Sequence, residues 1–114
     1  MKAYPAMEMR AEWLPKLRSW AKENKSIREL WLFGSRATGC SRPESDVDLA
    51  IALMPAIGKT NWALGDFYAL HPKWKRQLEE IVGRHVSLQP LIPNNDLDMI
   101  VRSSGVLLWT RDGA

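Results

Sequence analysis

The chain contains a single cysteine, Cys40, among its 114 residues. One cysteine allows neither an internal disulfide nor a multi-cysteine zinc site, so nothing in the sequence requires an oxidising compartment. The most apolar stretch, residues 49–57, is interrupted by Pro55 and is far shorter than the roughly 20 residues of a membrane-spanning helix. The first ten residues also lack the apolar centre of a signal peptide. We therefore expect a cytoplasmic protein without a membrane partner.

Neither sign of charge is in large excess, since 16 Lys and Arg oppose 13 Asp and Glu and give a net charge of +3. This excess is too small to indicate nucleic acid as a partner, and no interleaving of basic and aromatic residues supports one. Eight basic residues lie within residues 1–36, where they predict a solvated helix face or a lining of an acceptor site. Residues 37–70 are locally acidic, with two basic and four acidic residues.

Glycine and proline are not abundant, and the seven of each are scattered, which disfavours collagen-like and disordered structure. A hydrophobic fraction of 46% suffices for one modest core at this length. We expect a single domain over residues 1–114 and leave a homo-oligomer open.

Apolar residues recur in two patterns that predict alternating helices and strands. Helices are expected over residues 7–24, 60–82 and 96–103, strands over residues 27–33, 47–54 and 86–92, and a strand or extended tail over residues 106–110. Glycine, serine and proline between residues 34 and 45 predict a loop or a broken helical turn. Hairpin and crossover connections are mixed in this order. We therefore predict an α+β or α/β domain with a small mixed β-sheet covered by helices on one side.

Prolines and caps bear on the helix boundaries. The first helix either has Pro15 in its first turn or kinks there, and Pro72 predicts a kink or a break between two helices. Asn94 or Asn95 is expected to cap the last helix, and Gly105 to end it.

Asp46 and Asp48 stand at the start of a predicted strand. Residues two apart on a strand point to the same face, so the two carboxylates are expected side by side. Adjacent carboxylates repel one another unless a cation lies between them. Magnesium prefers hard oxygen ligands completed by substrate phosphates, so the pair is a candidate Mg²⁺ site for a nucleotide.

Gly34, Ser35 and Arg36 follow directly on an apolar strand. Glycine allows the backbone to approach a ligand closely, serine offers a hydroxyl and exposed amides, and arginine offers a bidentate phosphate donor. An anion site opposite a metal site is what phosphoryl or nucleotidyl transfer needs.

The two segments together resemble a known signature. Gly34-Ser35, ten residues and then Asp46-x-Asp48 match the Gly-Ser, ten residues and Asp-x-Asp of the minimal nucleotidyltransferases, a family of the DNA polymerase β-like superfamily. The surrounding residues are similar too, and the resemblance extends over residues 27–110.

The resemblance implies a nucleotidyltransferase fold and Mg²⁺ on Asp46 and Asp48. It also implies a nucleoside triphosphate, ATP first, with its β- and γ-phosphates at Gly34 and Ser35. An acceptor hydroxyl would attack the α-phosphate, and pyrophosphate would leave. Single-domain members of the family resemble the antitoxins of toxin–antitoxin pairs, in which AMP is transferred to a helical HEPN-domain ribonuclease, so a HEPN-type partner is implied here.

One position departs from the family pattern. Members with full catalytic equipment carry a third carboxylate on a later strand, and Ser87 stands in its place here. Gln89 on the same face is a candidate neutral ligand, Asp96 or Asp98 would reach the site only if the loop folds back, and His85 is a candidate substrate contact. Ser87 therefore favours an alternative, in which a catalytically degenerate module binds and neutralises a partner protein without chemistry.

Overall fold

The computed structural model describes residues 11–39, 46–54, 62–93 and 95–111. Helices and strands alternate in the predicted order, and of the loop or broken helical turn predicted after the first strand, residues 35–38 form a helical turn, α2. They are α1 (Trp13–Glu23), β1 (Ile27–Phe33), α2 (Ser35–Thr38), β2 (Val47–Leu53), α3 (Trp62–Val82), β3 (Val86–Pro90), α4 (Asp96–Ser104) and β4 (Val106–Thr110).

The four strands form one mixed sheet in the order β3-β2-β1-β4. Strand β1 is antiparallel to both β2 and β4, whereas β2 and β3 are parallel and are joined by the crossover helix α3. Residues 106–110 therefore form a strand and not an extended tail. The predicted mixture of hairpin and crossover connections is confirmed.

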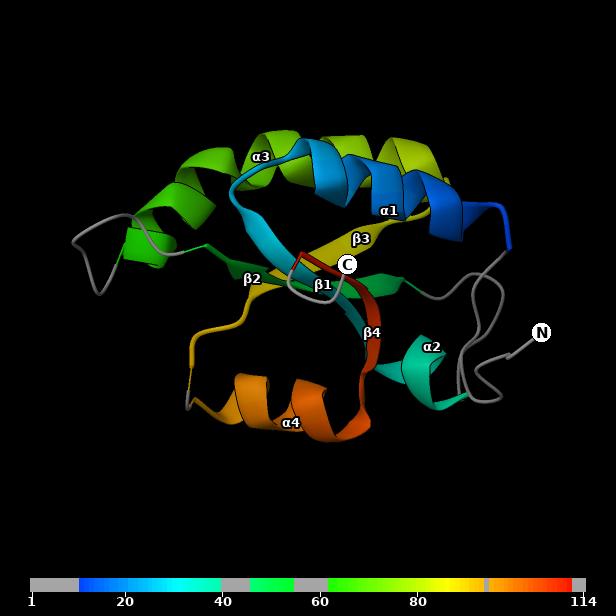
Figure 1. The fold of residues 1–114 in the computed structure, drawn as a ribbon. Coiled ribbons are helices and arrows are strands. Elements are labelled where there is room, and N and C mark those ends of the chain that lie inside the picture. Colours follow the sequence, from blue (N-terminus) through cyan, green and yellow to red (C-terminus); the bar gives the residue numbers. More distant parts are fainter. Residues whose placement is uncertain (1–10, 40–45, 55–61, 94, 112–114) are drawn as a thin grey trace.

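Helices α1 and α3 lie side by side over one face of the sheet (Figure 1). Between them, the rings of Trp20 and Trp74 meet edge to face with centroids 6.0 Å apart. The Trp74 Nε1–H donates to Asn24 Oδ1 at 3.1 Å, and the Trp20 Nε1–H donates to Gln77 Oε1 at 2.9 Å. Both buried indoles therefore have hydrogen-bond acceptors.

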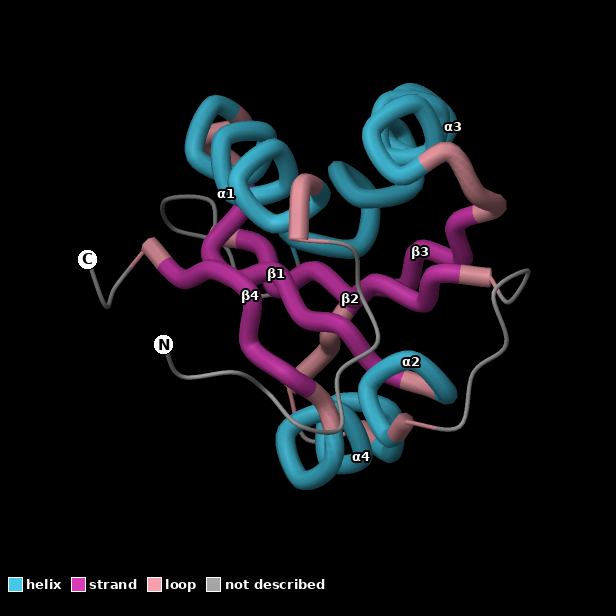
Figure 2. Tube along the Cα trace, turned by 90° about the vertical axis from the view of Figure 1, so that its right-hand side faces the viewer, coloured by secondary structure: helices cyan, strands magenta, loops and turns pink. Residues whose placement is uncertain are grey.

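Helix α4, together with α2, lies on the opposite face of the sheet (Figures 1 and 2). Our prediction that helices cover only one side is therefore wrong. A second cluster of buried side chains fills this face, formed by Ala50, Ala52, Leu91 and Val101. An amphipathic pattern reveals which side of a helix is buried, but it does not reveal which face of the sheet that side covers.

The helix boundaries decide between the alternatives left by the prolines. Pro15 lies in the first turn of α1, whereas Pro72 lies inside a continuous α3, so the predicted break into two helices is wrong. Asn95 caps α4, with its side chain accepting from the Asp98 N–H at 2.9 Å. Residues 7–10 of the first predicted helix, Cys40 and the alternative cap at position 94 lie outside the described residues. Within the described residues, no helix has the length and apolar character needed to cross a membrane.

Candidate active site

Pairing of β1 with β2 brings the two signature segments together. Phe33 is the antiparallel partner of Asp48, so Gly34, the next residue, emerges beside that carboxylate. Gly34 has φ 75° and ψ −155°, a conformation that is essentially restricted to glycine. A Cβ at this position would overlap Asp48 Oδ2. The glycine is therefore required both by the backbone turn into α2 and by the space that the carboxylate occupies.

The carboxylate pair lies on the α4 side of the sheet. Leu49 packs in the core under α1 and α3, and its neighbour Asp48 points to the opposite face because side chains alternate along a strand. Burial raises the pKa of the half-buried Asp48, and the charge of Asp46 raises it further. Arg36 and His85 act in the opposite direction. The charge of Asp46 is thus close enough to disfavour ionisation of Asp48.

This donor set fits a divalent cation. The two aspartates offer hard oxygen ligands, and their mutual repulsion is the interaction that a bound cation would reverse. Within the described residues, no group of three or more His, Cys, Asp or Glu side chains is arranged to hold a metal ion. The pair would therefore need additional oxygens from substrate phosphates and water, which is common for Mg²⁺.

Strand β3 places Ser87 beside the pair. In the parallel ladder Ser87 is the partner of Asp48. Its correspondence to the third carboxylate of the family stays a prediction from the sequence resemblance. Gln89 is exposed one step further along, opposite Ala50, and is farther from Asp48 in the ladder.

His85, predicted as a candidate substrate contact, contacts Asp46. Its Nδ1 lies 3.0 Å from Asp46 Oδ2, and its backbone carbonyl accepts from the Val47 N–H at 2.9 Å. The side chains of His85 and Asp46 are both more than half exposed, at 58% and 55% respectively. The signal in the sequence is the equal spacing of His85 and Ser87 at the start of β3 and of Asp46 and Asp48 at the start of β2.

The two later aspartates, Asp96 and Asp98, belong to α4. The buried Asp98 carboxylate accepts from Arg102 Nε at 2.9 Å, and Arg102 also donates to Glu29 Oε1 at 3.0 Å. This network ties α4 to β1. Asp96 is exposed in the first turn of α4. Neither residue is a ladder partner of Asp48, which pairs with Ser87 on β3.

Arg36 is buried, and its guanidinium carbon lies 5.5 Å from the centre of the Trp13 ring. The same guanidinium lowers the pKa of Asp48, so it lies near the pair as well as against α1. Ser35, the first residue of α2, is half-buried, and Gly34 is exposed. All five predicted site residues therefore gather around the start of β2 and the end of β1.

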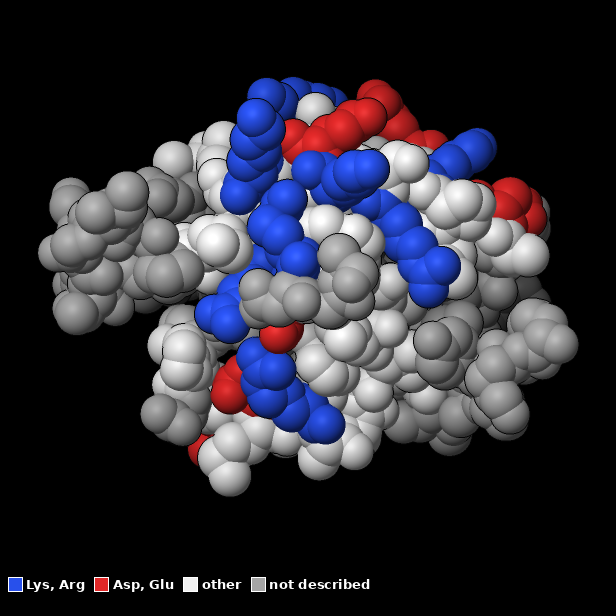
Figure 3. Space-filling view, viewed as in Figure 1, with Lys and Arg blue, Asp and Glu red and all other residues white. Residues whose placement is uncertain are grey.

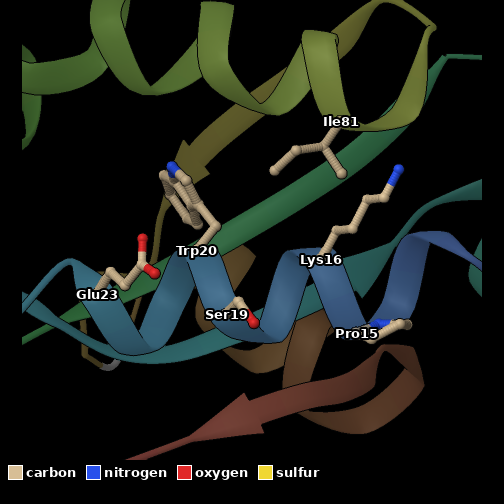
Figure 4. Close-up of a pocket in the computed structure, with 6 residues that line it drawn as sticks. All are labelled: Pro15, Lys16, Ser19, Trp20, Glu23 and Ile81. Atoms are coloured by element: carbon tan, nitrogen blue, oxygen red, sulfur yellow. The ribbon is translucent and has the colours of Figure 1, made fainter.

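A groove of about 420 Å³ separates α1 from α3 on the other face of the sheet. Its lining comprises Pro15, Lys16, Ser19, Trp20, Glu23 and Ile81 (Figure 4). Lys and Arg side chains also gather over α1 (Figure 3). Since α1 and the carboxylates lie on opposite faces, the basic side chains of α1 form a solvated helix face and do not line the candidate site.

Comparison with known proteins identifies the family of this chain. The family model described as polymerase beta, nucleotidyltransferase, matches residues 15–114. The chain belongs to this nucleotidyltransferase family. A comparison with curated proteins gave no significant match.

Solved structures share the fold of this nucleotidyltransferase. A chain in a toxin–antitoxin crystal structure with AMP-PNP superposes with a TM-score of 0.62 at 22% identity, covering 88% of this chain and 75% of that one. A chain of the toxin–antitoxin MntA-HepT gives a TM-score of 0.62 at 18% identity, with coverages of 91% and 75%. A structure of the tri-AMPylated Shewanella oneidensis HEPN toxin in complex with the MNT antitoxin gives 0.60 at 18% identity, with coverages of 89% and 72%.

Proposed function

We propose that this protein is an Mg²⁺-dependent nucleotidyltransferase that transfers AMP from ATP to a hydroxyl of a HEPN-type partner protein. The observation that carries the proposal is the packing of the Gly34 backbone against the Asp48 carboxylate. This packing brings the candidate phosphate-binding segment, Gly34 and Ser35, next to the candidate metal site, Asp46 and Asp48. Membership of the nucleotidyltransferase family supports the reaction class. The similar toxin–antitoxin structures, one with AMP-PNP and one with a tri-AMPylated HEPN toxin, support the nucleotide and the partner.

Each site residue has a role in this proposal. Asp46 and Asp48 hold Mg²⁺, which when bound neutralises phosphate charge and draws electrons from the reacting phosphorus. Gly34 and Ser35 offer backbone amides and a hydroxyl to the β- and γ-phosphates. Arg36 adds a fixed positive charge beside the carboxylates, where it also favours the ionised form of Asp48.

The reaction is an in-line displacement at the α-phosphorus. The acceptor oxygen forms a new bond to this atom while the bond to the bridging oxygen breaks, and pyrophosphate leaves with that electron pair. The hydroxyl proton passes to water. The residues of this chain act by positioning and by charge, as is usual in transfers to phosphorus. The cytoplasmic location expected from the sequence stays part of the proposal, since ATP is supplied there.

Nucleotide binding is the first test. Calorimetric titration with a non-hydrolysable ATP analogue, with and without Mg²⁺, compares the wild type with the double variant Asp46→Asn, Asp48→Asn. We expect binding that depends on Mg²⁺ and is lost in the double variant. Glu80→Gln is the matched control, because it neutralises an exposed carboxylate on α3, across the sheet from the site. Absence of binding under every condition, also with the partner present, would contradict the proposal.

Transfer to the partner is the second test. A HEPN-type protein is incubated with the chain, ATP and Mg²⁺, and intact mass spectrometry measures whether the mass of one or more AMP groups is added. We expect addition with the wild type and with Glu80→Gln, and none with the double variant.

The degenerate module is a second candidate because Ser87, the ladder partner of Asp48, is the residue that the sequence resemblance aligns with the third carboxylate of the family. In this case the chain would neutralise its partner by covering it. The double variant separates the two candidates, since neutralisation by occlusion would survive the loss of both carboxylates. Neutralisation by AMP transfer would disappear with them.

A further inference from the structure

Two polar residues at the start of β3, His85 just before it and Ser87 within it, face Asp46 and Asp48 at the start of β2. Ser87 is the ladder partner of Asp48, and His85 extends the same pairing to Asp46 through the bond from the Val47 N–H to the His85 carbonyl. Each aspartate thus has one polar neighbour on the adjacent strand. The side chain of His85 contacts its aspartate, with 3.0 Å between Nδ1 and Asp46 Oδ2.

The direction of this contact follows from chemistry. An ionised carboxylate only accepts hydrogen bonds, so Nδ1 of His85 carries the hydrogen and donates it to Oδ2 of Asp46. This bond engages one oxygen of Asp46 and leaves the other oxygen for a ligand. It also fixes the tautomer of His85, with the hydrogen on Nδ1 in the neutral ring.

The orientation of the Asp46 carboxylate depends on this hydrogen bond. Its side chain is 55% exposed, and it precedes the first residue of β2, so little packing restricts its rotamers. His85, in contrast, sits on a fixed backbone. The Val86 N–H donates to Glu79 Oε2 at 3.0 Å, and Lys75 Nζ donates to the same oxygen at 2.7 Å. The start of β3 is therefore attached to α3, and His85 is held by it.

We propose that His85 is a positioning residue that holds the Asp46 carboxylate in the orientation in which it binds a divalent cation. The inference rests on the proposed function, because Asp46 must be a metal ligand for its orientation to matter. Ligating carboxylates are commonly oriented by hydrogen bonds of this kind, and loss of such a partner lowers metal affinity by about 10–100-fold. His85 would thereby compensate in part for the missing third carboxylate.

Two amide substitutions test which ring nitrogen matters. His85→Asn places an N–H donor close to the position of Nδ1, whereas His85→Gln places one close to Nε2. Binding of Mn²⁺ alone is measured by electron paramagnetic resonance of the free ion. We expect His85→Ala and His85→Gln to weaken binding about tenfold, and His85→Asn to stay within about threefold of the wild type. Ser19→Ala, a neutral change on the far face of the sheet, is the control.

Two outcomes would overturn the inference. If His85→Gln restores binding and His85→Asn does not, the active nitrogen is Nε2 and His85 acts directly and not through Asp46. If all three variants bind Mn²⁺ as the wild type does, His85 positions nothing. Circular dichroism of each variant verifies that the fold is retained.

A metal-free readout separates this inference from the proposed function. Long-range ¹H–¹⁵N spectra at about pH 8, where a free imidazole is neutral, report the tautomer of His85. We expect the Nδ1–H form in the wild type and its loss in Asp46→Ala. An Nε2–H form in the wild type would overturn the inference even if Mn²⁺ binds. A wild type that shows the Nδ1–H form but binds no metal would instead contradict the proposed function.

Discussion

Gly34 leaves no room for a side chain against Asp48, since a Cβ on the glycine would overlap Oδ2 of the carboxylate. The two residues are brought together by the β1–β2 pairing, in which Asp48 is the partner of Phe33. The glycine of the Gly-Ser pair is therefore explained by packing within the free protein.

Gly34→Ala is expected to unfold more easily and to lose nucleotide binding. The substitution forces an alanine into a positive-φ conformation, which costs roughly 1–3 kcal/mol, and it also pushes the Asp48 carboxylate away. Urea denaturation and calorimetric titration measure the two effects. Gly83→Ala is the matched control, because Gly83 also has a positive φ, of 66°, but has no atom within 4 Å of the added Cβ.

The difference between the two glycine variants measures the effect of the contact with Asp48. Gly83→Ala should show the cost of the backbone alone, about 1–2 kcal/mol, with nucleotide binding intact. Equal destabilisation of both variants, with binding preserved in both, would show that the space beside Asp48 is unimportant.

Asp48→Asn is expected to stabilise the protein without metal while removing its nucleotide binding. Burial, and then the charge of Asp46, raise the pKa of Asp48 above its ordinary value of 3.8. A group with a raised pKa contributes stability that is fully present below pH 3.8 and is lost as pH rises through the higher value. At neutral pH the ionised Asp48 therefore opposes folding, and the amide removes this penalty.

Thermal denaturation at several pH values measures the effect of Asp48→Asn. We expect the Tm at neutral pH to rise by about 1–4 °C, a small change because the group is partly exposed and screened by water. The difference from the wild type should shrink at about pH 3, where the wild-type carboxyl is protonated as well. A Tm of the variant below that of the wild type at neutral pH would show that the charge of Asp48 does not destabilise the fold.

Much of the site could be predicted because it is local in sequence. The period of two of a strand predicts Asp46 and Asp48 side by side, and in the structure the charge of Asp46 acts on Asp48. The Gly34-Ser35 pair lies at the end of an apolar strand, which the run before it indicates. Pattern and spacing were sufficient for these residues.

Other features depend on contacts that no local pattern reports. The stripe of α4 predicts a buried side, but the sheet face that it covers depends on β2, whose alanines leave space for a helix. The burial of Arg36 arises from Trp13 in another helix. The contact between His85 and Asp46 arises from the register of parallel strands, which a crossover of 21 helical residues brings about.

Asn95→Ala is expected to destabilise the protein by about 1 kcal/mol, which corresponds to roughly 4 °C in Tm. The Asn95 side chain accepts from the Asp98 N–H at 2.9 Å, and alanine leaves this donor at the start of α4 without its acceptor. Asn95→Asp keeps an acceptor and adds a charge that favours a helix N-terminus, so it should retain the stability. A similar loss in both variants, seen by thermal denaturation, would argue against the cap.

Ser87→Asp would introduce a third carboxylate in the row beside Asp48. Without metal, a third negative charge should add repulsion, raise the pKa of Asp48 further and lower the Tm by a few degrees, on the order of 1 kcal/mol. With Mn²⁺ or Mg²⁺, the same charge should become favourable and raise metal affinity about tenfold, judged from the usual effect of one ligand-shell residue.

The matched control for Ser87→Asp is Gln89→Asp, which adds the same charge on the same strand face one step away, opposite Ala50. Only Ser87→Asp should reverse the sign of its effect on Tm when metal is added, because only that carboxylate can share a cation with Asp48. Identical behaviour of the two variants would mean that charge in general, and not its place in the ladder, governs stability. An increase of AMP transfer in Ser87→Asp would further show that the serine limits a working enzyme, whereas transfer absent in both would favour the occluding module.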